Sequence, residues 1–233
     1  MKDKFDEIIN YNKWLSTLKI NTTLPYRVIN QYSNENKREV FEMLNLFYEK
    51  YYSDKEKRIL ILGSSPSMRS SGIIGIPFAN AKQIKKEFDI DYTCKSYNNN
   101  SDHFMEEVIE KLGGYTVFYK KFYMNFVFPF PIQKFNAKSN FVNANYYENK
   151  KLYIELEPII IESIKNIIKI GINRSVCYCI GTGENLKFLS SINEKYHFFD
   201  SIVALEHPRY IMQYNYKNKE KYIEKYVNTL RGN

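Results

Sequence analysis

The stretch ILILGSSPSMRSSGIIGIPFAN, residues 59–80, decides the fold. It opens with four apolar residues and a glycine, ILILG, directly after the charged segment SDKEKR. A short continuous apolar run of this kind is typical of a strand buried in a parallel sheet. The Gly- and Ser-rich segment that follows would leave the sheet at its carboxyl edge, where open α/β folds bind ligands. This stretch therefore predicts a parallel sheet and a binding site at its edge.

Further apolar runs and helical patterns alternate along the rest of the chain. Strands are predicted over residues 123–130, 175–181 and 201–207, and helices over residues 103–112, 151–170 and 184–195. Two more helical patterns precede the first strand, over residues 4–18 and 37–52. Strands that alternate with helices imply crossover connections and a sheet covered on both faces. We expect an α/β fold with three layers, α/β/α, around a central, mostly parallel four-stranded sheet.

Length and hydropathy bound the organisation of the chain. Its 233 residues, 44% of them hydrophobic, suffice for one domain, which we expect to span residues 1–233 with a helical N-terminal layer over residues 1–55. The longest apolar stretch, residues 158–172, contains one glutamate and two lysines, and no apolar run follows the N-terminus. We therefore expect no membrane span and no signal peptide, and a monomeric cytoplasmic protein.

Cysteines, histidines and glycines argue against a cofactor. Three cysteines cannot supply a four-cysteine iron–sulfur cluster, and the three histidines lack the HExxH spacing of zinc enzymes. The glycines of residues 63–80 fit neither GxxxxGK[ST] nor GxGxxG. The segment GTGE, residues 181–184, is explained by the turn and helix start that a short strand-to-helix loop requires. We expect no metal and no nucleotide cofactor.

The chain carries a formal charge of +8, from 34 basic and 26 acidic residues. Such a balance favours a polyanionic partner through counterion release. The abundance of Lys, Asn, Ile and Tyr is also what an AT-rich genome encodes, so charge alone does not identify the partner.

His207 is the most specific single candidate for chemistry. It ends the last predicted strand, directly before Pro208 and Arg209, and so reaches the same sheet edge as residues 63–80. A histidine there is either a ligand-facing group or the cap of a strand end.

Five segments carry a resemblance to a known family. They are GSSPSMRSSGIIGIPFAN (63–80), FYKKFYMNFVFPFPI (118–132), NANYYENKKL (143–152), GINRSVCYCIGTGENLKFL (171–189) and ALEHPRYIMQY (204–214). In order and spacing they resemble the uracil-DNA glycosylase superfamily, and most closely a bacterial branch of the single-strand-selective monofunctional uracil-DNA glycosylases. The resemblance runs from about residue 59 to the C-terminus.

The resemblance implies base excision from single- or double-stranded DNA that contains a damaged base. Enzymes of this family flip the nucleotide out of the helix, stack its base on an aromatic ring and hydrolyse the N-glycosidic bond with water and no cofactor. The base leaves as an anion, so a pocket that favours the anion lowers the barrier.

Matched residue by residue, the family's functional positions fall on named residues of this chain. Phe78 matches the base-stacking phenylalanine, and His207 the histidine that stabilises the leaving base. The loop residues Gly63, Ser64 and Pro66 would contact the substrate. Those matched to DNA contact are Arg209, Tyr210, Ile211 and Met212, the last three as candidates to enter the gap that the flipped base leaves. Phe78 has an alternative as a core residue, and residues 211–214 as an ordinary helix start.

The chain departs from the family at two positions. The first motif usually reads GxNP, with the Asn positioning the attacking water, but Ser65 stands in that place here. We expect Asn80 or Asn143 to take over part of this role. Phe126 stands where relatives carry an Asn that reads the uracil edge, and a one-residue bulge would let the adjacent Asn125 substitute for it.

Three functions stay open on this basis. The first is a DNA glycosylase acting on uracil or a related damaged base, with Ser65 in the catalytic position. The second is a DNA-binding relative without catalysis, and the third is a nucleobase- or nucleoside-binding protein on the same scaffold. Salt-dependent binding to single-stranded DNA separates the third from the others, and abasic-site formation separates the first from the second.

Overall fold

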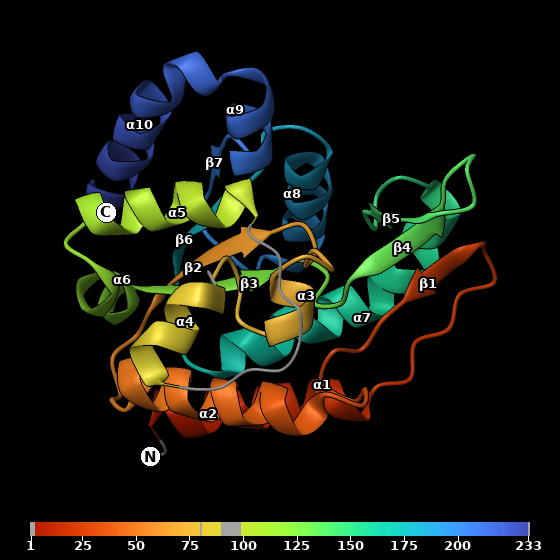
Figure 1. Cartoon of the computed structure of the whole chain (residues 1–233), viewed down its shortest axis with the longest axis horizontal. Coiled ribbons are helices and arrows are strands. Elements are labelled where there is room, and N and C mark those ends of the chain that lie inside the picture. Colours follow the sequence, from red (N-terminus) through yellow and green to blue (C-terminus); the bar gives the residue numbers. More distant parts are fainter. Residues whose placement is uncertain (1–2, 80, 90–98, 233) are drawn as a thin grey trace.

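A four-stranded parallel sheet forms the centre of the protein (Figure 1). The computed structural model describes residues 3–79, 81–89 and 99–232. The strands are ordered β3–β2–β6–β7, and all three neighbouring pairs are parallel. Their bounds are Ile59–Gly63 for β2, Phe122–Phe126 for β3, Asn173–Ile180 for β6 and Ile202–Leu205 for β7. The predicted three-layer α/β fold with a four-stranded sheet is confirmed.

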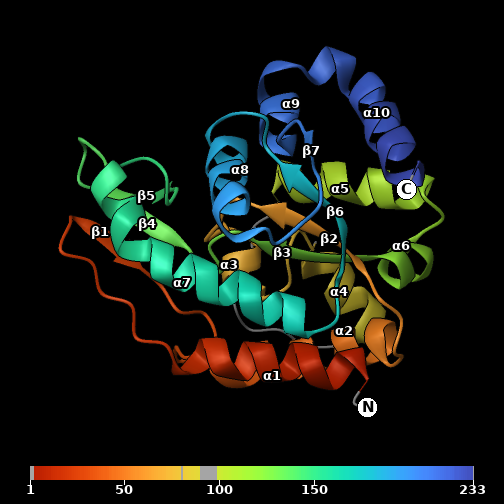
Figure 2. The same ribbon diagram turned by 180° about the vertical axis from the view of Figure 1, so that it is seen from behind.

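Helices cover both faces of this sheet. One face carries α7 (Lys150–Lys169) and α8 (Glu184–Tyr196), which lie in front of the strands in Figure 2. The other carries α5 (Asn100–Lys111) and α9 (Pro208–Tyr214), which pack against each other. The chain steps from β2 to its neighbour β3 and then returns past β2 to β6 and β7. Because crossover connections are right-handed, the helices between β2 and β3 lie on one face of the sheet, and the helices between β3, β6 and β7 lie on the other.

The remaining helices complete the connection from β2 to β3 and close the chain. They are α3 (Ser71–Ile74), α4 (Ala81–Phe88) and α6 (Tyr115–Lys121) after β2, and the single turn η1 (Tyr216–Asn218) and α10 (Lys219–Arg231) after α9. The basic C-terminal helix α10 packs on both α5 and α9.

The N-terminal helices α1 (Lys4–Thr17) and α2 (Lys37–Tyr52) lie where the sequence predicts them. Helix α1 packs on α2 and α7. Tyr52 of α2 donates a hydrogen bond of 2.9 Å to the carbonyl of Phe122, so α2 is tied to the outer strand β3. None of the helices in the described parts of the chain is long and apolar enough to cross a membrane.

A second, antiparallel sheet has no counterpart among the predicted elements. Its order is β1–β4–β5, with β1 at Tyr26–Val28, β4 at Ile132–Phe135 and β5 at Phe141–Ala144. The strand predicted over residues 123–130 ends at Phe126, because the Phe-Pro repeats after it place prolines at 129 and 131, which cannot donate ladder hydrogen bonds. The chain then turns away into β4, so the small sheet projects beside the carboxyl edge of the central one (Figure 1).

Candidate active site

The carboxyl ends of β2, β3 and β7 bring the predicted site residues to one edge of the central sheet. Gly63 ends β2 and pairs with Phe126, the last residue of β3. His207 follows the end of β7, which is separated from β2 by β6 alone. Two strand spacings amount to about 10 Å, so His207 and the loop after Gly63 lie near each other at this edge of the sheet.

Gly63 lets two aromatic rings close over the end of β2. A Cβ atom at this position would lie 2.8 Å from the Phe78 ring and 2.9 Å from the Phe126 ring, so no larger residue fits. The two rings stack with centroids 5.3 Å apart and an angle of 26° between their planes. Phe78 also has a left-handed backbone, with φ of 54°, and its N–H donates to the Ser71 hydroxyl. A phenylalanine held in this costly conformation marks a position that the surrounding structure enforces.

The loop after Gly63 is tied to β5 and its continuation by two asparagines. The hydroxyls of Ser64 and Ser65 both donate to Oδ1 of Asn145, at 3.1 and 3.3 Å. Asn143 instead donates to the hydroxyl of Ser67 and accepts from the Met68 N–H. The structure thus brings Asn145, not the expected Asn143, to Ser65. Both asparagines belong to one of the segments that carry the resemblance, and nothing in the spacing of that segment distinguishes them.

His207 begins α9 as its N-cap. Its Nδ1 accepts a hydrogen bond of 3.0 Å from the Arg209 N–H, which assigns the proton of the neutral imidazole to Nε2. Burial and the positive charge of Arg209 lower the pKa of His207 to about 4. At neutral pH the side chain is therefore an uncharged donor through Nε2, and a strand end and helix start hold it in place.

Helix α9 exposes only part of the predicted DNA-contact segment. Arg209 and Tyr210 are exposed and Met212 is half-buried. Ile211 is fully buried, so its entry into DNA stays a prediction that this structure does not support. It lies three residues after the buried Pro208, on the helix face that packs against the core. Two large exposed side chains close by were not predicted as contacts, Tyr214 and Tyr216.

Asn125 is engaged inside the fold. The β2–β3 register runs without a break from Ile59 to Gly63, so the expected one-residue bulge is absent there. Nδ2 of Asn125 donates to the Tyr123 hydroxyl, and Oδ1 of Asn125 accepts from the Phe126 N–H. Because neighbouring strand residues point to opposite faces, Asn125 faces away from the Phe78 ring that contacts Phe126. Asn80 lies outside the described residues.

A buried carboxyl lies against the far end of the same loop. Asp102, in the first turn of α5, is 3% exposed, and burial raises its pKa to about 7, against a hydrogen bond from Ser70 that acts in the opposite direction. The cap residue of α5, Asn99, also donates to the Ser70 hydroxyl at 3.3 Å. The sequence pattern, an ordinary helix start, gave no sign of this group.

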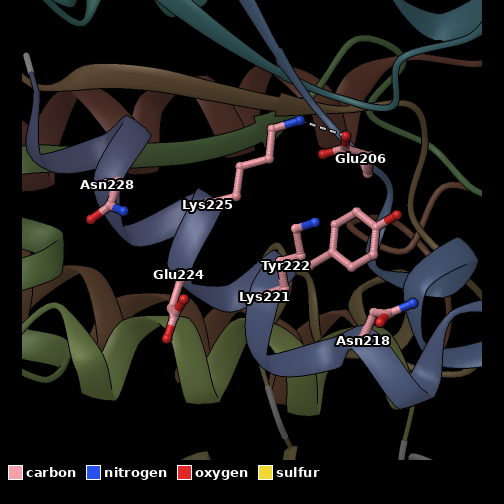
Figure 3. Close-up of a pocket in the computed structure, with 7 residues that line it drawn as sticks. All are labelled: Glu206, Asn218, Lys221, Tyr222, Glu224, Lys225 and Asn228. Atoms are coloured by element: carbon pink, nitrogen blue, oxygen red, sulfur yellow. Dashed lines mark hydrogen bonds and ion pairs between the residues drawn. The ribbon is translucent and has the colours of Figure 1, made fainter.

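An open cavity of about 520 Å³ lies beside the site, between α10 and the residue before His207. Figure 3 shows the side chains that line it, which are Glu206, Asn218, Lys221, Tyr222, Glu224, Lys225 and Asn228. None of these was predicted as a site residue. Lys225 and Glu206 form an ion pair of 2.6 Å across its rim. Within residues 3–79, 81–89 and 99–232, no cluster of three or more His, Cys, Asp or Glu side chains is arranged to hold a metal ion.

Comparisons with known proteins identify the family of the chain. The family model of the uracil DNA glycosylase superfamily matches residues 49–231, which include Gly63, Ser65, Phe78 and His207. The wild-type crystal structure of SMUG2 from Pedobacter heparinus superposes with a TM-score of 0.91 at 36% sequence identity, covering 100% of this chain and 98% of that one. No curated protein sequence matches the chain. Because the family match spans most of its length, the chain belongs to the uracil DNA glycosylase superfamily.

Proposed function

We propose that the protein is a monofunctional DNA glycosylase that hydrolyses the N-glycosidic bond of uracil in DNA after the nucleotide is flipped out. Family membership supports the class of reaction. The observation that carries the proposal is His207, a neutral imidazole whose Nε2 proton is free of the internal hydrogen bond made by Nδ1. A preorganised neutral donor suits a leaving base that becomes an anion.

The reaction needs only water and the substrate. The water oxygen bonds to the sugar C1′ as the bond from C1′ to the base nitrogen breaks, and the electron pair of that bond moves into the base. The negative charge spreads to the carbonyl oxygens of uracil, one of which accepts the Nε2 hydrogen bond of His207. The water proton leaves to solvent, and the products are free base and an abasic sugar.

Ser65 and Asn145 form the candidate water-positioning pair. The Ser65 hydroxyl donates its only proton to Oδ1 of Asn145, so the lone pairs of its oxygen can accept a hydrogen bond from a water molecule. That contact would leave a water lone pair directed away from Ser65, toward an incoming sugar. Asn145 thus helps to position the attacking water through the Ser65 hydroxyl, whereas the Asn of the usual motif positions it directly.

Phe78 is the proposed stacking partner of the flipped base, with Arg209 and Tyr210 as outer DNA contacts. Phe78 is buried and already stacked on Phe126, so the base must enter beside this pair or shift it. Phe126 offers no hydrogen bond to the uracil edge, and discrimination would then rest on shape, backbone groups and His207.

The deciding experiment incubates the protein with single- and double-stranded oligonucleotides carrying one uracil, followed by alkali to cleave abasic sites. Strand cleavage that depends on both uracil and alkali is the expected result, since a monofunctional enzyme leaves the backbone intact. Cleavage without alkali would refute the monofunctional mechanism. Tight salt-dependent binding without abasic sites would replace the proposal by a DNA-binding role, which Ser65 in the Asn position favours.

A further inference from the structure

The outward face of the small sheet carries a stacked pair of exposed phenylalanines. Phe135 of β4 and Phe141 of β5 are cross-strand partners, and their ring centroids lie 4.2 Å apart with 29° between the planes. Their exposed fractions are 59% and 45%, among the largest for apolar side chains in the described residues. Cross-strand stacking stabilises the hairpin, but it leaves a large apolar surface in solvent, and such a surface is a candidate interaction site.

Polar groups extend this aromatic pair into a continuous surface. Cross-strand partners share a face, and so do alternate residues of one strand. Arg27 pairs with Gln133, and Gln133 with Asn143, so these three side chains lie on the same face as the two rings. The Arg27 guanidinium lies over the Phe141 ring, 5.5 Å from its centroid. We call this surface, made of Arg27, Gln133, Phe135, Phe141 and Asn143, the hairpin platform.

The hairpin platform leads directly to the active-site loop. Asn143, two residues from Phe141 on the same strand, donates to the Ser67 hydroxyl and accepts from the Met68 N–H. Ser67 is two residues from Ser65 in the loop. Two residues of strand span about 7 Å, so the rings lie within reach of a strand of DNA that passes through the site.

The hairpin turn holds the rings in position before any partner binds. Oδ1 of Asn136 accepts hydrogen bonds from the N–H groups of Lys138 and Asn140, at 2.9 and 3.0 Å. The opposite face of the sheet is anchored in the core through Ile132 and Ala144, both buried. A rigid aromatic surface of this kind loses little entropy on binding.

Resting on the proposed function, we propose that the hairpin platform binds single-stranded DNA next to the target nucleotide. Bases stack on aromatic side chains irrespective of sequence, and Arg27 and the exposed Lys138 of the turn supply positive charge for the phosphates. The chain's net charge of +8 favours the same polyanion. The platform would select unpaired DNA, because bases in a duplex have no free faces.

Binding is tested without catalysis by the Phe135→Trp variant, titrated with uracil-free oligothymidylate of about 15 nucleotides. Stacking of a base should quench the fluorescence of the introduced tryptophan. Adding the Phe141→Ala change should lower the affinity measured in this titration, on the order of tenfold. Unchanged fluorescence of the introduced tryptophan at saturating DNA would overturn the inference. The native Trp14 lies on α1, so the unmodified chain supplies the background.

Catalysis gives an independent measurement on the full-length protein. The Phe135→Ala/Phe141→Ala double variant should raise KM for uracil in a long single strand by about tenfold relative to a trinucleotide too short to reach the platform. Phe135→Leu/Phe141→Leu keeps apolar area but removes stacking, and should behave like the alanine variant. The matched control is Val117→Ala on α6, also exposed (54%) but at the other end of the molecule (Figure 1).

The outcomes separate the two proposals. No excision by the parent protein defeats the proposed function, while the fluorescence titration of Phe135→Trp still tests the platform. Normal excision with the same ratio of KM values in the parent and the alanine variant defeats the platform alone. A parent that dimerises in sedimentation velocity, with a monomeric double variant, would assign the face to a second copy of this chain and overturn the inference as well.

Discussion

The hydrogen bond between Nδ1 of His207 and the Arg209 N–H has a chemical consequence. It keeps Nδ1 unprotonated, and the lowered pKa of about 4 keeps the ring neutral in ordinary buffers. An imidazole that is neutral at working pH carries no extra proton to transfer to the leaving base. Its contribution is therefore to stabilise the charge of that base through a hydrogen bond. The same arrangement explains why a residue that caps a helix can also serve the reaction, since the cap uses one ring nitrogen and leaves the other.

The His207→Ala change should lower uracil excision about a hundredfold to a thousandfold, the usual effect of losing one preorganised donor. Binding to uracil-containing DNA should stay close to the parent value, because the hydrogen bond strengthens as charge develops. Single-turnover excision and equilibrium binding measure the two effects. The control is His103→Ala, a half-buried histidine of α5 whose Nδ1 lies 3.4 Å from the Glu106 carboxylate. Parental excision by His207→Ala would remove His207 from the site.

Ser65 and Asn145 make a second prediction, because they act as a pair. Ser65→Asn should raise excision by about tenfold or more, since an amide reaches farther toward the sugar and positional errors of about 1 Å cost on the order of a hundredfold. Asn145→Ala in the parent should lower excision, and Asn143→Ala, which frees Ser67 but not Ser65, should lower it less. If Ser65→Asn is slower than the parent, the serine is fitted to its own water site.

Helix α10 fixes the end of the strand that delivers His207. The buried Tyr226 donates its hydroxyl proton to the Glu206 carbonyl, one residue before His207, and Lys225 pairs with the Glu206 side chain. A second tyrosine makes a comparable contact elsewhere, since Tyr178 of β6 donates to the Thr229 carbonyl at 3.0 Å. The two contacts tie one helix to two neighbouring strands.

Tyr226→Phe should therefore lower kcat several-fold with little change in KM, because it loosens the backbone that orients the imidazole. Tyr178→Phe removes a similar hydrogen bond at a distance from His207, so both variants should lose about 1 kcal/mol of stability. Steady-state kinetics measures the effect of each variant on kcat, and urea denaturation measures its effect on stability. Equal kcat values for the two variants would reduce Tyr226 to a structural role.

The central sheet could be predicted from sequence and the small sheet could not, for a physical reason. The strands β2 and β3 are buried along their whole length and β6 over its last five residues, so ILILG and its neighbours read as continuous apolar runs. The strands β1, β4 and β5 have three or four residues and mixed burial, and β1 lies far from β4 in the chain. Such short strands exist through pairing across the chain, which periodicity does not report.

The site shows the same division. Strand topology located Gly63, Ser65 and His207 at one sheet edge, because it carries strand ends there, and the family resemblance pointed to Phe78. It could not reveal that Ile211 faces inward, that Asn125 serves Tyr123, or that Asn145 is the partner of Ser65, because each depends on side-chain direction. The buried carboxyl of Asp102 could not be predicted for a similar reason, because its burial is produced by packing between α5 and the loop around Ser70.

Asp102 makes the stability of the whole molecule depend on pH. Its pKa is about 7 when folded and near 3.8 as a free carboxyl, so the folded state binds more protons between these values. Stability from this group is therefore full below about pH 4 and is lost as pH rises toward 7. Asp102→Asn should remove the loss and stabilise the protein by a few kcal/mol at about pH 8, at roughly 1.4 kcal/mol per unit of pKa.

Urea denaturation of the parent and Asp102→Asn at about pH 5 and about pH 8 measures this difference, which should grow in favour of the variant at the higher pH. His207 has a lowered pKa and so acts in the opposite direction, gaining stability as pH rises from about 4 to 6.5. It is present in both proteins, and its contribution cancels in the comparison. Asp200→Asn, at an exposed aspartate, is the control for the loss of a surface carboxylate. A constant difference between parent and Asp102→Asn across this range would mean that Asp102 stays ionised in the folded protein, and that the loop around Ser70 is held beside a buried charge rather than a neutral acid.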